Sequence, residues 1–274
     1  MQQVSGRVIN PLAIEAQVLR DLPADEVVHA AAAAGFDMAG IWIDPAIWTS
    51  AMTRRVRRAF RETGLVALDA EVVRITGGKI EDAQRRLIDI AAEIGARHVI
   101  AVSLTPDRAA SAASLAALAD HAASAGIGIV IEFAPFSSIA TVAAAIDVAT
   151  AAGPSVGILP DPIHLIRSGG RPADLAALPP ERILFAQICD AGPGPEAPTA
   201  DSLLWEARHD RYLLGEGTLP LADYVAALPP GLILSDETRS LKIERLYPDP
   251  WRRAQAVGDR LRMSLRVWAK NRQE

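Results

Sequence analysis

The feature that most constrains the fold is an eightfold alternation of short apolar segments with longer, alanine-rich segments. The short segments have strand length, whereas the longer ones carry apolar residues at the spacing of amphipathic helices. We predict strands over residues 7–10, 38–43, 65–72, 98–103, 128–133, 156–159, 183–188 and 231–235. We predict helices over residues 24–34, 46–63, 80–94, 109–125, 139–152, 219–227 and 251–269.

Strands that alternate with helices favour a parallel sheet covered on both faces. Eight such units predict an α/β fold of one closed (β/α)8 TIM barrel, with residues 1–274 as a single domain. The alternative is an open, doubly wound sheet, which usually carries a glycine-rich phosphate loop after its first strand. Here Pro11, Leu12 and Ala13 follow the first predicted strand, so a nucleotide cofactor is not indicated.

Charge and cysteine content exclude several classes of function. The formal net charge is −5, which provides no general attraction for nucleic acid phosphates. The single cysteine, Cys189, excludes an internal disulfide and a cysteine-rich metal site. No apolar run is long enough to span a bilayer, and the first residues do not resemble a signal peptide. We therefore expect a cytoplasmic protein with no nucleic acid or membrane partner, and a homodimer is left open.

Polar residues occur at or just beyond the ends of four consecutive predicted strands: Glu132, Asp161, Gln187 and Glu237. A carboxylate at a buried strand end is costly unless it is paired or bound to a metal. In a barrel, these four strand ends would direct their oxygens to one point. The oxygen-rich set predicts one divalent metal ion, Mn²⁺ or Mg²⁺, with Zn²⁺ or Co²⁺ as alternatives. Each acid alone could instead be a loop residue or a salt-bridge partner.

Four further residues are candidates for catalytic or substrate-binding roles, and of these we predict His164, Arg74 and Arg211 as catalytic. His164 lies three residues after Asp161 and could act as a general base, as a fifth ligand, or as a loop histidine bonded to backbone. Arg74 follows the third predicted strand and could clamp a carboxylate, a phosphate or a polyol, or form a salt bridge. Arg208 and Arg211 could contact an anionic substrate or hold the neighbouring loop.

The loop over residues 190–217 is long and rich in proline, glycine and charge. Long loops in compact domains are usually functional or disordered, and this one is expected at the C-terminal face of the barrel, where active sites form. Asp190 could orient a metal ligand or His164. Cys189 has no evident partner base, and we interpret it as a small buried thiol.

Several motifs together resemble those of the sugar phosphate isomerase/epimerase family, which is the xylose isomerase-like TIM barrel superfamily. They are the segments 131–137 (IEFAPFS), 161–165 (DPIHL) with 167–169 (RSG), 187–191 (QICDA), 215–217 (GEG) with Arg211 before it, and Glu237 with Ser240. The resemblance covers essentially the whole chain and is strongest from Gly128 to Ser240. It implies a metal-dependent barrel with ligands at Glu132, Asp161, Gln187 and Glu237.

This resemblance implies a metal-dependent isomerase or epimerase that acts on a polyhydroxylated sugar, sugar phosphate or inosose-like carbonyl compound through an enediolate. Many isomerases of the family have histidine as the third ligand, whereas Gln187 with His164 is similar to the bacterial 3-dehydroshikimate dehydratases, which are lyases. Residues 40–44 depart from the acidic motif of those dehydratases. A barrel that binds a small ligand without catalysis is the alternative from another functional class.

Overall fold

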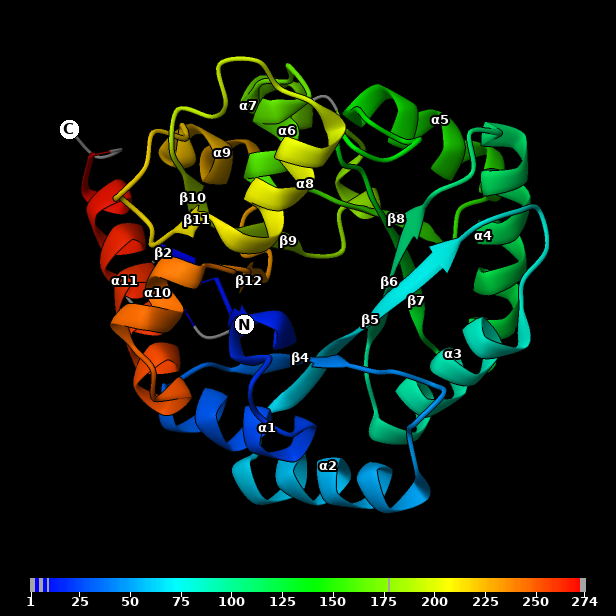
Figure 1. The fold of residues 1–274 in the computed structure, drawn as a ribbon, viewed down its shortest axis with the longest axis horizontal. Helices are drawn as coiled ribbons and strands as arrows, with labels where there is room; N and C mark the ends of the chain where they lie inside the picture. The colour runs from blue at the N-terminus through cyan, green and yellow to red at the C-terminus, as the bar shows by residue number, and fades with distance from the viewer. Residues whose placement is uncertain (1–2, 5–6, 9, 177, 272–274) are drawn as a thin grey trace.

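The computed structural model describes residues 3–4, 7–8, 10–176 and 178–271. Eight parallel strands form a nearly closed barrel, surrounded by a ring of helices (Figure 1). The strand order is β8-β7-β6-β5-β4-β3-β12-β9, and a parallel bridge from Ile158 to Ile183 joins the two edges. The predicted (β/α)8 barrel is therefore confirmed, and the open doubly wound sheet is wrong.

The barrel strands are β3 (Leu12–Ile14), β4 (Met38–Trp42), β5 (Val66–Ile75), β6 (His98–Ser103), β7 (Gly128–Glu132), β8 (Val156–Leu159), β9 (Ala186–Ile188) and β12 (Leu234–Asp236). The α-helices are α1 (Ala24–Ala33), α2 (Ser50–Thr63), α3 (Asp82–Ile94), α4 (Arg108–Ala123), α5 (Val142–Ala152), α6 (Pro162–Arg167), α7 (Pro172–Ala176), α8 (Ala200–His209), α9 (Leu221–Ala227), α10 (Leu241–Leu246) and α11 (Pro250–Asn271). Two 3-10 helices, η1 (Ala16–Leu19) and η2 (Pro180–Arg182), and two short antiparallel pairs complete the described elements: β1 (Gln3–Val4) with β2 (Arg7–Val8), and β10 (Asp190–Ala191) with β11 (Arg211–Tyr212).

Local sequence signals define the helix ends. At the start of α2, the Thr49 side chain accepts a hydrogen bond from the Met52 amide, and α3 begins with a capping box between Glu81 and Gln84. Helix α2 ends at Gly64, which adopts a left-handed conformation with φ of 74°. Glycine adopts this conformation without steric cost, so the chain can turn directly into β5.

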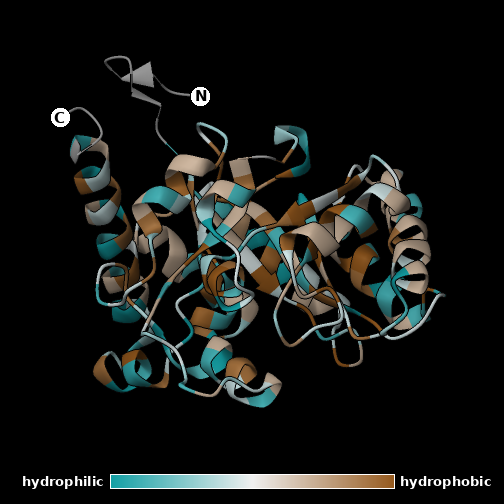
Figure 2. Cartoon of the chain, turned by 90° about the horizontal axis from the view of Figure 1, so that it is seen from above, coloured by the Kyte–Doolittle hydropathy of each residue, from teal (hydrophilic) through white to brown (hydrophobic). Residues whose placement is uncertain are grey.

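Two hydrophobic clusters hold the layers together. The larger cluster lies between the strands and the helices. Figure 2 shows apolar colouring along the central strands and a mixture of apolar and polar residues on the helices around them. The smaller cluster fills the barrel interior with one residue from each of seven strand segments: Ala13, Met38, Leu68, Ile100, Val130, Leu159 and Phe185. This plug closes the lower part of the barrel, so a ligand can enter only above it.

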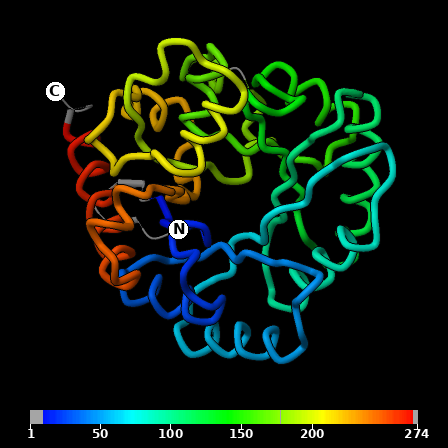
Figure 3. Tube along the Cα trace, viewed as in Figure 1, coloured from blue at the N-terminus to red at the C-terminus, as the bar shows by residue number. Residues whose placement is uncertain are grey.

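The ring of helices closes between its first and last members. Helix α11 packs beside α1, as the red and blue segments of the tube show (Figure 3). Among the described residues, no helix combines the length and the apolar character needed to cross a membrane.

The first predicted strand is wrong. The first barrel strand is β3, where Ala13 pairs with Met38 of β4 and Leu12 pairs with Leu234 of β12. Of the predicted range 7–10, residues 7–8 form β2, and residue 9 lies outside the described residues. Three consecutive buried residues form β3, a pattern that fits a strand covered on both faces but shows no period-2 alternation.

Two further boundaries differ from prediction. Arg74 lies inside β5, not after it, because β5 continues past a register shift and pairs Ile75 with Ser103 of β6. The segment 190–217 is not a continuous loop: it contains α8, which begins with a capping box between Thr199 and Ser202. The short helices α6 and α7 agree with the irregular sixth unit of the sequence.

Candidate active site at the C-terminal rim

The site is a polar layer one pleat above the apolar plug. Side chains two positions apart on a strand point to the same face, so the residue two positions after a plug residue also faces the barrel interior. Three strands follow this rule, with Val130, Leu159 and Phe185 of the plug followed by Glu132, Asp161 and Gln187. The alternation of the strands thus accounts for the shared interior position of three of the four residues that the sequence predicts to converge, whereas Glu237 follows no plug residue in this way.

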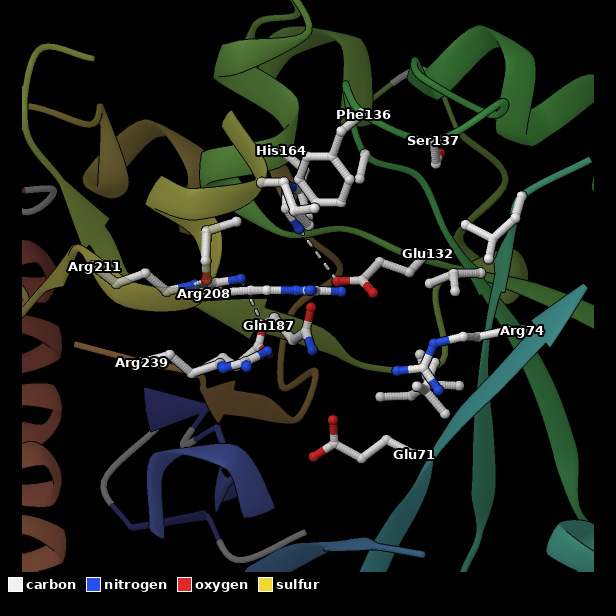
Figure 4. Close-up of a pocket in the computed structure, with 18 of the residues that line it drawn as sticks. Glu71, Arg74, Glu132, Phe136, Ser137, His164, Gln187, Arg208, Arg211 and Arg239 are labelled. Carbon is white, nitrogen blue, oxygen red and sulfur yellow. Dashed lines mark hydrogen bonds and ion pairs between the residues drawn. The ribbon is translucent and has the colours of Figure 1, made fainter. Parts of the chain in front are cut away.

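Glu132, Asp161 and His164 form a cluster of side chains that could hold a metal ion, and one ligand atom from each lies within 4.8 Å of the others. His164 Nε2 lies 3.5 Å from Glu132 Oε1 (Figure 4). Asp161 is the N-cap of α6, and its Oδ1 accepts a hydrogen bond of 2.9 Å from the Ile163 amide. The short helix therefore holds both Asp161 and His164 toward Glu132.

Arg211 lies at the centre of the site and is almost fully buried. Its Nη1 donates to Asp161 Oδ2 at 2.6 Å, and its Nη2 lies 2.9 Å from Glu237 Oε2. The same guanidinium donates to the Ala207 carbonyl and to Cys189 Sγ, at 2.7 and 3.2 Å. Arg211 thus ties two of the predicted metal ligands to strand β11.

These contacts set opposite pKa directions for the two carboxyl groups. Burial alone would raise the pKa of Asp161, but the charges of Arg211 and His164 outweigh it and hold that pKa below its ordinary value. Burial raises the pKa of Glu237 to about 8, because Arg211 compensates only part of that effect. Asp161 is therefore the carboxylate that stays ionised in this pair.

The donor set fits a divalent cation. Gln187, on β9, is 2% exposed, and its Oε1 has no hydrogen-bond partner among the described residues. A buried amide oxygen without a partner is costly, and a metal ion would satisfy it. Carboxylate, amide and imidazole donors at one point are compatible with several divalent ions, so the arrangement suggests a divalent metal without identifying it.

A cavity of about 450 Å³ opens above this cluster. Its lining includes Glu132, His164, Gln187, Arg211 and Glu237. Of the predicted ligands, Asp161 lies behind the cavity, in contact with Arg211. The volume is within the usual range for small-molecule sites and suits one small, polar substrate.

Other arginines line the same cavity. Arg74, predicted as a substrate-binding residue, stacks over Trp42 with its guanidinium carbon 5.6 Å from the ring centroid. Arg208 and Arg239 also contribute to the lining. Burial lowers the pKa of Arg239, and the charges of Arg211 and Arg208 add to this effect against the opposing charge of Glu237. Sequence reasoning missed Arg239, although it lies two residues after a predicted ligand.

A group of buried acids beside the site was also missed. Glu15, Asp69 and Glu71 are buried, and each has at least one carboxyl oxygen without a hydrogen-bond partner among the described residues. Burial and the neighbouring acids raise the pKa of Glu71 to about 8. Asp69 and Glu71 interrupt a predicted apolar strand as Glu132 does, so the same signal was present. Only Glu71 of the three lines the cavity.

One interpretation of the sequence was that Asp190 orients a metal ligand or His164. In the structure its carboxylate instead binds backbone amides. Its Oδ2 accepts hydrogen bonds from the amides of Gly215 and Gly217, at 2.9 and 3.0 Å, and its Oδ1 accepts one from Leu219. A side chain at Gly217 would overlap the Ala191 carbonyl and the Asp190 carboxylate. The Gly-Glu-Gly segment is therefore a backbone turn built around Asp190.

Comparisons with known proteins place this geometry in context. The model of the xylose isomerase-like TIM barrel family matches residues 28–235. A 3-dehydroshikimate dehydratase of Pseudomonas aeruginosa is 31% identical over 216 residues, which are 73% of this chain and 33% of the relative. The chain thus spans about a third of the length of the curated relatives it matches.

Solved structures share the fold at low sequence identity. The IOLI protein with a bound zinc atom has a TM-score of 0.78 at 17% identity, covering 95% of this chain and 98% of that chain. A D-allulose 3-epimerase of Methylomonas sp., in complex with D-allulose, has a TM-score of 0.71 at 18% identity, covering 93% and 96%. The barrel and its rim site agree with the family match over residues 28–235. The chain therefore belongs to the xylose isomerase-like TIM barrel family, whose members include epimerases and dehydratases.

Proposed function

We propose that this chain is a divalent-metal-dependent isomerase or epimerase that acts on a polyhydroxylated carbonyl compound through an enediolate. The observation that carries the proposal is the convergence of Glu132, Asp161 and His164 beside the unpartnered Gln187 oxygen at a cavity of about 450 Å³. A site of this kind needs a divalent ion and a base that can remove a proton next to a carbonyl group.

The proposed ligands are Glu132, Asp161, Gln187 and Glu237. A divalent ion held there would polarise the substrate carbonyl and stabilise negative charge on its oxygen. Mn²⁺ or Mg²⁺ is the expected ion because oxygen donors dominate the set, and the zinc-bound structural neighbour keeps Zn²⁺ as an alternative.

His164 is the proposed base. Its Nε2 faces Glu132 Oε1 at 3.5 Å, and the Phe136 ring packs edge-on against the imidazole with 5.3 Å between centroids. These contacts limit rotation of the ring, so that Nε2 stays directed into the cavity to accept the substrate proton. As an alternative, His164 is itself a ligand and a metal-bound carboxylate takes the proton.

Arg211 and Arg74 have different proposed roles. Arg211 donates hydrogen bonds to Asp161, Ala207 and Cys189, and its Nη2 lies 2.9 Å from Glu237 Oε2, so most of its guanidinium is already engaged within the protein. We propose that it mainly orients the ligand carboxylates. Arg74 has no salt-bridge partner among the described residues, and its full set of donors is available to orient the substrate.

The test is α-proton exchange. D-allulose, D-fructose and 3-dehydroshikimate are incubated in D₂O with Mn²⁺-loaded protein, and deuterium incorporation beside the carbonyl is followed by NMR. Exchange with at least one substrate, lost after chelation with EDTA and restored by Mn²⁺, is the expected result. Full exchange in metal-free protein contradicts the proposal, and ligand binding without any exchange favours a non-catalytic binding barrel.

Glu132→Gln tests the ligand assignment directly, with Glu71→Gln as the matched control in the same cavity but outside the proposed set. We expect Glu132→Gln to lower bound metal, measured by elemental analysis, at least 10-fold, because a neutral amide replaces an anionic ligand. Glu71→Gln should retain the metal. Equal metal content in both variants would refute the assignment.

A 3-dehydroshikimate dehydratase-like lyase is the second candidate. Gln187 as the third ligand and the 31% identity to the Pseudomonas aeruginosa enzyme over 216 residues favour it. Isomerisation and dehydration can share proton removal beside the carbonyl, so the same residues serve either outcome. Loss of water from this cyclic ketone gives an aromatic, ultraviolet-absorbing product, which separates the lyase from an isomerase.

A further inference from the structure

Three arginines line the cavity in addition to Arg211. Figure 4 shows Arg208, Arg211 and Arg239 entering from one side and Arg74 from the other, with Glu132 and Gln187 between them. The protein as a whole is acidic, with a formal net charge of −5, so this local concentration of arginines runs against the overall charge of the chain.

The carboxylates around these arginines do not neutralise them equally. Arg211 has two close partners, Asp161 and Glu237, at 2.6 and 2.9 Å. Arg239 reaches only Glu237, at 3.9 Å, and its buried Nε has no hydrogen-bond acceptor among the described residues. Arg208 likewise has no salt-bridge partner in the described part of the chain. Like charges that share a cavity repel each other unless an anion lies between them.

We propose that Arg208 and Arg239 form an anion subsite, which binds a carboxylate or phosphate group of the substrate while the carbonyl end of the substrate lies at the metal site. This inference rests on the proposed function for the reactive end of the ligand and adds the chemical class of the other end. Guanidinium groups suit this role because they offer parallel N–H donors that match the oxygens of both anions.

The opposite wall limits the length of the ligand. Arg74 is held over the Trp42 ring across the cavity, and the whole space is about 450 Å³. This volume accommodates a sugar-sized polyol or a cyclic hydroxyketone with one anionic group. The substrate class is therefore an anionic polyhydroxylated carbonyl compound, because a neutral sugar would supply no anion to Arg208 or to the unpaired Nε of Arg239.

The experiment measures binding by isothermal titration calorimetry with the full chain, both Mn²⁺-loaded and EDTA-treated. The probes are 3-dehydroshikimate as the carboxylate, D-fructose 6-phosphate as the phosphate, and D-allulose as the neutral compound. Arg208→Gln and Arg239→Gln are compared with wild type. Arg57→Gln, on the exposed face of α2, is the matched control outside the cavity.

We expect one anionic probe to bind at least 10-fold more tightly than D-allulose. Each cavity variant should weaken that binding by about 10-fold to 100-fold, the usual contribution of a hydrogen bond to a charged group. Binding of D-allulose and the behaviour of Arg57→Gln should not change. Comparison of the two anionic probes shows whether the subsite prefers a carboxylate or a phosphate group. If Arg239→Gln fails to fold, the exposed Arg208→Gln carries the test.

Equal affinity for D-allulose and both anions, or an anion preference that survives in both variants, would overturn the subsite. The proposed function fails separately. If the protein prefers anions but catalyses no α-proton exchange, the proposed isomerase or epimerase activity is refuted and the anion subsite is supported. Exchange without anion preference removes the subsite and leaves the enzyme.

Discussion

Replacement of Arg211 by methionine tests how the buried charges at the rim are balanced. The side chain is 2% exposed, and Asp161 and Glu237, at 0% and 6%, lie 2.6 and 2.9 Å from its guanidinium. Methionine fills a similar volume but removes the only ion-pair partner of Asp161 among the described residues, and it leaves Glu237 with only the more distant Arg239, at 3.9 Å. Breaking a buried pair by removing one partner costs about 3–5 kcal/mol. For a chain of this size, that loss lowers the melting temperature by roughly 10 °C.

The assay is urea unfolding of each protein under two conditions. One sample is metal-free, in EDTA, and the other has had the chelator removed and contains a saturating concentration of Mn²⁺. A divalent ion can replace the lost positive charge if Asp161 and Glu237 are ligands. We therefore expect Mn²⁺ to restore more stability to Arg211→Met than it adds to wild type. The double variant Arg211→Met with Asp161→Asn should be more stable than the single variant in EDTA, because the buried charge is gone.

Arg260→Met is the matched control, since it removes a half-exposed ion pair of 2.7 Å with Glu216. Such a pair contributes at most about 1 kcal/mol. A loss below 1 kcal/mol for Arg211→Met in EDTA would show that the Arg211 contacts do not hold the rim together. If Mn²⁺ stabilises wild type and Arg211→Met equally, Asp161 and Glu237 are not ligands of the metal.

Two further predictions concern stability away from the metal ligands. Burial lowers the pKa of His98 to about 4, so below pH 6.5 the unfolded chain takes up a proton before the folded one does. His98 alone should therefore lower the free energy of unfolding by about 1–2 kcal/mol from pH 7 to pH 5, and His98→Phe should reduce this loss. The measurement is urea unfolding of wild type and variant at both pH values, and an identical pH dependence in the two proteins contradicts the reasoning. A Cβ at Gly40 would lie 2.6 Å from Glu15 Oε2 and 2.9 Å from Asp69 Oδ1, so Gly40→Ala should cost about 1–3 kcal/mol. The cost should be smaller in a Glu15→Ala background, where only the Asp69 overlap remains; equal costs would show that the Glu15 contact contributes nothing.

The cluster of polar side chains at the rim was predictable because its signal is local. A polar residue that interrupts or ends an apolar strand can be identified in a single segment, and Glu132 is the clearest case. The structure brings Glu132, Asp161 and His164 together and places Gln187 and Glu237 on the same cavity. The period-2 alternation of strands makes such residues share the barrel interior with the apolar plug below them.

The contacts of Arg211 were not predictable in the same way. Its partners Asp161 and Glu237 lie 50 residues before it and 26 residues after it in the sequence, and no local pattern joins them. Arg239 needed the same long-range information to be recognised as a cavity residue. Glu15 was missed for a different reason: with the first strand predicted at residues 7–10, this position fell outside the barrel.

By itself, the sequence determined the alternation of strands with helices, the closed barrel that this alternation predicts, and the strand ends that carry polar groups. Periodicity carries this information because it records which side of each segment is buried. Only the tertiary structure decided that β3, rather than residues 7–10, pairs with β4 and β12, and that Arg211 neutralises two of the candidate ligands. Pairing between distant segments depends on closure of the whole sheet, and no single segment contains that information.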